Sequence, residues 1–138
     1  MKLLTDNLEI GTFITEQLNE ILPTYPIISD KPTESPFCVY RRTGFISKNT
    51  KDRFNYEETI SIEIILCATT YKDSITLAQR VKDKLEAFYG IWRNTFINCI
   101  SLENTNEDWS NDAYIQRLYF TIDIDNGMVA KIKRKEML

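Results

Sequence analysis

Histidine is absent from the 138-residue sequence, and its absence removes several kinds of chemistry. Histidine is the side chain whose unperturbed pKa suits proton transfer near neutral pH, and it is the commonest metal ligand. Without it, neither a Ser-His nor a Cys-His catalytic pair can form. Carboxylates and lysine could still support catalysis, but the composition favours a protein that is not an enzyme and needs no cofactor.

Cysteine and glycine are scarce and scattered. The three cysteines, Cys38, Cys67 and Cys99, are too few and too far apart for a disulfide framework or a zinc site. Each lies in an apolar stretch, so we expect small buried side chains in a reducing compartment. The four glycines form neither a phosphate-binding loop nor a dinucleotide-binding pattern.

Long apolar runs are missing as well. The run at residues 1–4 is far too short for a signal peptide, and no stretch approaches the ~20 apolar residues of a membrane span. We therefore expect a protein that is made and kept in a cytoplasm and has no membrane partner.

There is no excess of positive charge. The chain has 17 basic and 20 acidic side chains, a net charge of -3, which argues against bulk binding of nucleic acid. Its 43% apolar and 27% charged residues are ordinary for a globular protein, and its length suits one domain. We assign residues 1–126 to this domain and residues 127–138 to a short basic C-terminal tail.

The first half of the chain predicts a helix followed by strands. Apolar residues recur at helical spacing from Ile10 to Leu22, and Pro23 stops the helix. Residues 25–29 form a short β-prone segment, and residues 37–47 alternate as a strand that bends at Gly44. The clearest strand covers residues 59–69, beyond a polar loop at 48–55. One face of this strand is lined by Ile60, Ile62, Ile64 and Leu66.

The second half repeats the order of helix and strands. A helix opens at Thr70, with Asp73 three residues on as its capping partner, and Gly90 is a plausible stop. Its expected apolar stripe consists of Ile75, Ala78, Val81, Leu85 and Phe88. A strand at 96–103, a polar acidic loop at 104–111 and a strand at 112–125 follow. The whole predicts an α+β fold, in which a mainly antiparallel sheet of four to five strands carries two helices on one face.

Two oppositely charged groups lie far apart in the sequence. The basic group on the first predicted hairpin consists of Arg41, Arg42, Lys48, Lys51 and Arg53. The acidic group lies in the loop at 104–111 and at its edges, and consists of Glu103, Glu107, Asp108 and Asp112, with Trp109 beside them. Because one subunit's acidic loop could meet the next subunit's basic hairpin, we predict a subunit interface at both groups. Two alternatives stay open: both are merely solvated loops, or the basic hairpin contacts DNA phosphates.

Aromatic residues at the ends of elements favour an assembly surface. Tyr71, Tyr89, Trp92 and Trp109 lie where a monomer gains little from large rings, and tyrosine and tryptophan are enriched in interface cores.

A different class of function rests on Asp123 and Asp125, which share a strand face. Together with a lysine they could serve a small metal-dependent nuclease.

Three segments, taken in order, resemble a family of small tail-completion, or tail-terminator, proteins of phages and prophages. The first is the entry to a long strand, SPFCVY at residues 35–40. The second is the helix SITLAQRVKDKL at 74–85, and the third is the strand DAYIQRLYFTI at 112–122. The resemblance covers about residues 7–126 and rests on the order and spacing of the segments. The tail after Gly127, which many members lack, departs from it.

The resemblance implies a structural subunit of a virion tail or neck, assembled in the cytoplasm of a bacterial host. It implies a ring of copies of the chain, usually six, on the last disc of the tail tube. Such a ring would end tube growth and offer a surface to the neck proteins. The implied partners are further copies, the tail tube protein and a neck or head-completion protein, with passing contact to DNA in the lumen. A head-completion or neck subunit is the runner-up, because it would share the size, charge and ring.

Overall fold

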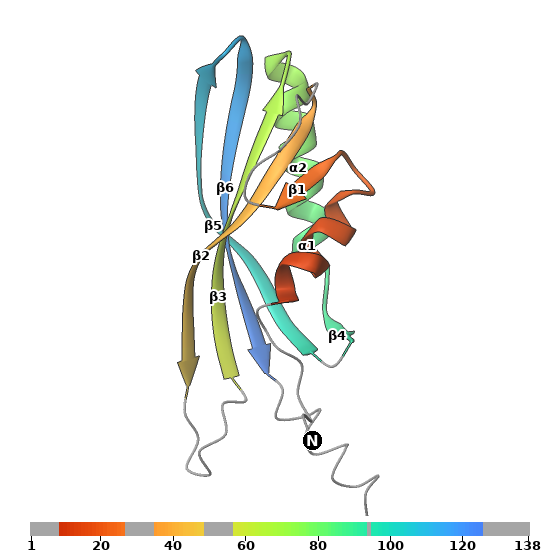
Figure 1. Cartoon of the computed structure of the whole chain (residues 1–138), viewed down its shortest axis with the longest axis vertical. Coiled ribbons are helices and arrows are strands. Elements are labelled where there is room, and N and C mark those ends of the chain that lie inside the picture. Colours follow the sequence, from red (N-terminus) through yellow and green to blue (C-terminus); the bar gives the residue numbers. More distant parts are fainter. Residues whose placement is uncertain (1–8, 27–34, 49–56, 94, 126–138) are drawn as a thin grey trace, which may run out of the picture.

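The structure is a computed structural model, and it describes residues 9–26, 35–48, 57–93 and 95–125. These residues form two helices and a six-stranded, strongly twisted mixed sheet (Figure 1). The elements are α1 (Ile10–Leu18), β1 (Thr24–Pro26), β2 (Phe37–Lys48), β3 (Glu57–Ala68), α2 (Tyr71–Glu86), β4 (Gly90–Trp92), β5 (Thr95–Ser110) and β6 (Ala113–Asp125). The strand order is β1-β2-β3-β6-β5-β4.

The predicted α+β class is confirmed, while the strand count was too low. The two extra strands, β1 and β4, have three residues each, too few for a periodic pattern to reveal. The described pairings are antiparallel except the one at the edge, where β1 runs parallel to β2. The β-prone segment predicted at 25–29 appears in part as β1, and its residues 27–29 lie outside the described ranges.

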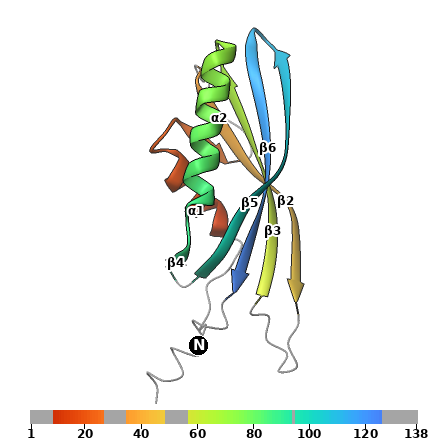
Figure 2. The same ribbon diagram turned by 180° about the vertical axis from the view of Figure 1, so that it is seen from behind.

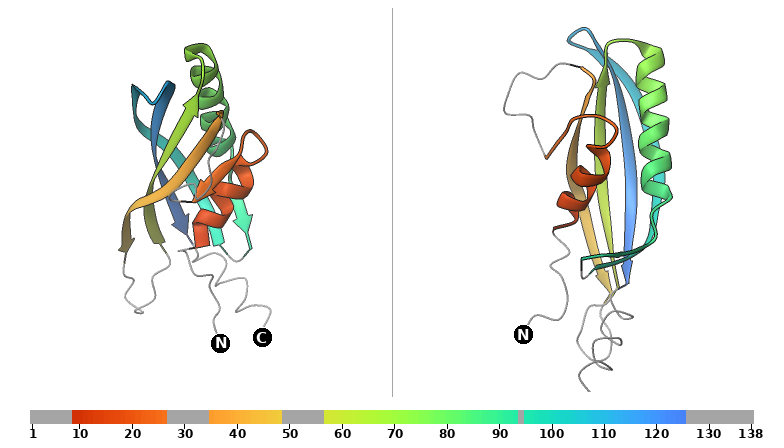
Figure 3. Two further views of the ribbon diagram at one scale, coloured as in Figure 1. Left: turned by 45° about the horizontal axis from the view of Figure 1, so that its top comes forward. Right: turned by 90° about the vertical axis from the view of Figure 1, so that its right-hand side faces the viewer.

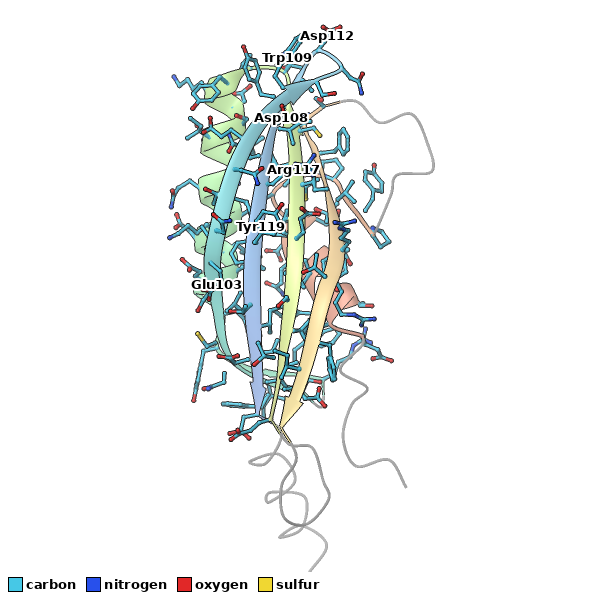
Figure 4. The ribbon with its side chains drawn as sticks, turned by 90° about the vertical axis from the view of Figure 1, so that its left-hand side faces the viewer. Glu103, Asp108, Trp109, Asp112, Arg117 and Tyr119 are labelled. Carbon is cyan, nitrogen blue, oxygen red and sulfur yellow. The ribbon has the colours of Figure 1, made fainter. Side chains whose placement is uncertain are left out.

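Both helices cover the same face of the sheet (Figures 1 and 2). Helix α1 lies over β1 and β2, and α2 lies over β3, β6 and β5 (Figure 3). The alternation predicted for β3 holds, since Ile60, Ile62, Ile64 and Leu66 are all fully buried beneath the helices. The central strand β6 supplies the next row of the core, formed by Leu118, Phe120, Ile122 and Ile124. The opposite face, called here the outer face, has no helix over it in the described part of the chain (Figure 4).

Helix α1 is shorter than predicted. It ends at Leu18, so Ile21 and Leu22 lie beyond it, although Leu22 is still buried. Gly11 allows α1 to approach β2 closely, because a Cβ atom there would lie 2.8 Å from the ring of Tyr40. The close approach at Gly11 therefore lets α1 pack its buried side chains against the sheet.

Helix α2 begins as predicted, with the Asp73 N–H donating to Thr70 Oγ1 at 3.1 Å. The predicted apolar stripe is partly wrong. Val81 and Leu85 are buried, but Ile75 is 43% exposed and Ser74 is buried in its place. Ser74 Oγ accepts a hydrogen bond from Gln116 Nε2 at 3.2 Å. The helix is therefore turned so that its first turn presents a hydroxyl to the sheet and an isoleucine to the surface.

The acidic loop predicted at 104–111 is a strand. Strand β5 continues to Ser110 and pairs with β6 as far as Ala113, across a turn at Asn111 and Asp112. Both turn residues have positive φ, 52° and 60°, as a tight primed hairpin turn requires. Every side chain from Glu103 to Ser110 is exposed, so no apolar alternation marks the strand. We call Glu103–Ser110 together with Ala113–Gln116 the arm; it projects at the top of Figure 1.

The cysteines differ in burial. Cys38 is fully buried, and this burial raises the pKa of its thiol to about 11. Cys67 is half-buried, and burial raises the pKa of its thiol too. The expectation of a buried side chain is wrong for Cys99, which is exposed beside a β-bulge of β5.

Neither of the two described helices is long and apolar enough to cross a membrane.

Candidate interaction surface

The short edge strands β1 and β4 cover only part of their neighbours, β2 and β5. The rest of the edge of β2 and of β5 is uncovered by other described strands. On one side, β1 pairs only with Cys38–Tyr40, so the edge of β2 is open from Arg41 to Lys48. On the other side, β4 pairs only with Thr95–Ile97, so the edge of β5 is open from Asn98 to Ser110. An open strand edge carries backbone donors and acceptors that a second chain can pair with.

The β5 edge is partly closed by its own neighbours. The Leu102 N–H donates to Glu86 Oε2 at 3.0 Å, and this bond is the main reason that the pKa of Glu86 is lowered. The Thr105 N–H donates to Asn104 Oδ1 at 2.9 Å, and the Trp109 N–H donates to Asp108 Oδ1 at 2.7 Å. These bonds satisfy N–H donors on the edge without a partner strand. Such local bonds protect an exposed edge from non-specific pairing with other strands.

The predicted basic group is divided between the two faces of the sheet. Arg41 lies on the outer face opposite Glu63, whereas Arg42 lies opposite the buried Ile62 and so belongs to the helix face. Lys48 is the last residue of β2, and Lys51 and Arg53 lie outside the described residues. Among the described members of the group, only Arg42 therefore presents a charge on the helix face beside the open edge of β2.

Arg41 is held by the outer face. Its Nε lies 2.9 Å from Oε1 of Glu63, and Arg117 Nη1 lies 3.9 Å from Oε2 of the same carboxylate. The Glu63 side chain is only 3% exposed, and its Oε1 accepts no well-aligned hydrogen bond. Arg42, in contrast, forms no ion pair with any residue in the described part of the chain. The two neighbouring arginines therefore differ: Arg41 is paired with Glu63, whereas Arg42 has no ion-pair partner among the described residues.

The predicted acidic group lies on the arm. Glu103 lies at a β-bulge and accepts a hydrogen bond from Thr121 Oγ1 at 2.9 Å. Glu107 and Trp109 lie on the helix face, opposite Gln116 and Tyr114, while Asp108 alternates to the outer face. Asp112 lies in the turn at the tip (Figure 4). The structure thus places Glu107 and Trp109 on one face of the arm and Asp108 between them on the other face, and it keeps Glu103 apart from all three.

Glu107 and Trp109 line a small cavity where the arm meets the start of α2. This cavity, called here the notch, has a volume of about 270 Å³ and is lined by Tyr71, Glu107, Asp108, Trp109, Tyr114 and Gln116. The Tyr71 and Tyr114 rings meet edge to face with their centroids 5.7 Å apart, and Trp109 is 57% exposed. The notch therefore combines exposed aromatic rings with carboxylates.

The electrostatics of the notch are negative. The Tyr71 hydroxyl lies 3.0 Å from both carboxylate oxygens of Glu107 and donates to that carboxylate. This hydrogen bond, reinforced by partial burial and by the carboxylate charge, raises the pKa of Tyr71. No lysine or arginine occurs between Arg93 and Arg117, so the arm itself supplies no counter-charge.

A groove of about 190 Å³ continues from the notch between α2 and the open edge of β5. It shares Glu107 and Gln116 with the notch, and its apolar part is formed by Ile75, Ala78, Leu102 and Leu118. Lys82, paired with Glu86 at 2.8 Å, lies at its far side. The exposed Ile75, unexplained by packing within the subunit, is therefore a wall of this groove.

The predicted group of exposed aromatics is partly confirmed. Tyr71, Tyr89 and Trp109 are exposed, but Trp92 packs on Phe13 with ring centroids 5.5 Å apart, and its Nε1 donates to Glu16. Tyr114 and Gln116 were missed as site residues because they lie in a strand that also supplies the core. Their alternation with Ile115 and Arg117 was the pattern that could have placed them on the helix face.

The nuclease hypothesis rests on Asp123 and Asp125, near the end of β6. Asp123 is exposed and accepts a hydrogen bond from Thr59 Oγ1 at 2.9 Å. In the described ranges, no group of three or more Asp, Glu, Cys or His side chains is arranged to hold a metal ion. Among the described residues, the nuclease hypothesis therefore has no metal-holding group to support it.

No protein-family model matches the chain, and no curated protein matches it either. Among solved structures, the fold is similar to that of a chain from the virion of a native gene transfer agent particle. The TM-score is 0.58 at 9% sequence identity, and the match covers 81% of this chain and 84% of the other. The comparison therefore shows a shared fold.

Proposed function

We propose that this chain is a structural subunit of a phage-like virion, and more specifically a tail-completion protein that caps the tail tube as a ring. The observation that carries the proposal is the fold, which extends over most of the length of a chain from a gene transfer agent virion. The resemblance of residues 35–40, 74–85 and 112–122 to tail-terminator segments supports the same assignment.

The surface of the subunit agrees with assembly into a ring. A ring of identical subunits needs two different surfaces on each copy, one that meets the preceding copy and one that meets the next. The open edges of β2 and β5 lie at opposite sides of one sheet, as a head-to-tail arrangement requires. In the proposed ring, a hexamer by its resemblance to the family, one face contacts the tail tube protein and the other a neck protein.

Electron microscopy of particles made without this gene tests the proposal. Unattached tails of irregular, excessive length beside filled heads are expected for a tail terminator. Tails of normal length that fail to join heads would instead indicate a head-completion or neck subunit, which is equally a virion component. Intact, infectious or transducing particles would overturn the structural role. Supplying the wild-type chain from a plasmid is the matched control and should restore normal particles.

A further inference from the structure

We propose that the notch binds the Arg42 side chain of a second copy of this chain, whose β2 edge lies antiparallel along the open edge of β5. The inference rests on the proposed function, because it specifies how copies of the subunit contact one another. It assigns one occupant to a cavity for which the described part of the subunit supplies none.

The chemistry of the notch favours a guanidinium group. Aromatic faces attract cations, most strongly where water is partly excluded, and arginine also stacks flat on such rings. Tyr71, Tyr114 and Trp109 supply the rings, and Glu107 supplies a carboxylate whose oxygens face the same cavity. A carboxylate can accept two parallel N–H bonds from one arginine, which fixes the orientation of the bound side chain.

Strand direction requires that Arg42 approach on the correct face. Strands β2 and β6 run in one direction, and β3 and β5 run in the other. In the proposed contact, β2 of the second copy pairs antiparallel with β5 of the first, and β3 of the second copy lies on the far side of its β2. The second copy then has the same orientation as the first. Its helices then lie on the same face as those of the first copy. Arg42 and Phe45, which lie opposite the buried Ile62 and Ile60, therefore point to the side on which the notch opens.

The spacing of the two edges also agrees over the open part of β2, where Arg41–Ile46 faces Asn104–Asp108; β1 covers Cys38–Tyr40, so the pairing ends at Asp108. The β-bulge between Arg42 and Gly44 places Phe45 only two ladder positions from Arg42. With Arg42 opposite Glu107, antiparallel pairing brings Phe45 opposite Thr105, which lines the groove with Ile75 and Leu102. Phe45 and Ile75 are 45% and 43% exposed in the isolated subunit, so this contact covers two apolar side chains at once.

Three N–H groups on the β5 edge already have acceptors within the subunit, so pairing with a second strand depends on the contacts of Arg42 and Phe45. Glu86, Asn104 and Asp108 already accept the Leu102, Thr105 and Trp109 N–H groups. A partner strand exchanges these bonds for backbone bonds and gains little from them alone. The gain comes from Arg42 in the notch and Phe45 in the groove, which makes the edge selective for a strand that carries both.

Charge reversal tests the contact in particles. Arg42→Glu and Glu107→Arg, each supplied to particles lacking the gene, should each lower the particle yield by roughly tenfold or more, because like charges then meet. The double variant should restore the yield to within about threefold of wild type, since it rebuilds the pair in reverse. Asp123→Arg, a reversal on the outer face away from the groove, is the matched control and should leave the yield unchanged.

Two results would overturn the proposal: normal yields from both single variants, or a double variant no better than the worse single one. Either would leave the proposed function standing if deletion of the whole gene still gave defective tails. Circular dichroism melting of each purified variant checks folding, which is expected to be unaffected because both side chains are exposed.

A disulfide trap tests the strand register independently and leaves Arg42 and the notch intact. Ile46 and Asn104, both exposed and on the outer face, become direct neighbours across the proposed interface. Ile46→Cys with Asn104→Cys, in a Cys99→Ser background, should give covalent multimers when assembled particles are oxidised. The pair Ile46→Cys and Asp123→Cys should give none. Intact particles that yield no multimers from the first pair would exclude this register.

Discussion

The two halves of strand β5 share one backbone ladder with β6 but differ in every other respect. In the first half, Thr95, Phe96, Ile97 and Ile100 are buried, and Ile97 and Ile100 belong to the core, while in the second half every side chain from Glu103 to Ser110 is exposed. Backbone pairing alone contributes little net stability, because the same groups bond to water in the unfolded chain. We infer that the first half holds the fold and the second half presents a surface.

The largest expected effect is on the free energy of unfolding, and it should differ between a substitution in the core and one in the arm. Phe120→Ala should lower the free energy of unfolding by about 3–5 kcal/mol, because Phe120 is 1% exposed at the centre of β6 and its loss leaves a cavity. Trp109→Ala, at the exposed end of the arm, should cost less than ~0.5 kcal/mol. Urea unfolding followed by circular dichroism measures both. Equal losses in the two variants would contradict the division between the halves.

A second comparison concerns the ion-pair cluster on the outer face. Arg41→Gln should cost about 2 kcal/mol, because it leaves the Glu63 carboxylate, 3% exposed, with only the more distant Arg117. Glu63→Gln should cost roughly half as much or less, because both arginines then remain partly in water and can be solvated. The same unfolding measurement applies. A greater loss for Glu63→Gln would show that the buried carboxylate is not the costly partner.

A smaller effect on stability is expected from a substitution in the hairpin turn at the tip of the arm. Asp112→Gly is expected to raise the free energy of unfolding by about 0.5 kcal/mol, since glycine adopts the φ of 60° at this position without the strain of a side chain. Asp112→Ala, which keeps that strain, is the matched control and should not stabilise. Thermal melting followed by circular dichroism distinguishes the two, and a lower melting temperature for Asp112→Gly would argue against this turn geometry.

The smallest effect is limited to thiol chemistry. In the folded protein Cys99 should react quickly with a thiol reagent, while buried Cys38, with a pKa of about 11, should react only after unfolding. Because the folded-state pKa of Cys38 lies above its ordinary value of 9.0, its contribution to stability is complete below pH 9 and falls as the pH rises toward about 11. Thiol counting with and without urea measures this, and Cys38→Ala should remove the slow group. Rapid labelling of all three thiols in the native state would contradict the burial of Cys38.

Much of the fold could be predicted from local sequence. The alternation from Ile60 to Leu66 determined both the existence of β3 and the face that it buries, because side chains in a strand point alternately to its two faces. Thr70 determined the start of α2, since its hydroxyl caps a backbone donor that no helical bond can satisfy. The absence of histidine likewise limits the chemistry of the chain, whatever its fold, because no other side chain titrates near neutral pH without a perturbed pKa.

Tertiary structure alone decided the candidate site. The β5 half of the arm has no apolar period because every side chain from Glu103 to Ser110 is exposed, so only its pairing with β6 showed that residues 104–110 form a strand. Ile75 fits a helical stripe, yet the placement of α2 against the sheet turns it outward and brings Ser74 to Gln116. The notch joins Tyr71 to Glu107, residues 36 positions apart in the chain. A local pattern cannot contain such a contact, because it exists only when the helix and the two strands of the arm have packed together.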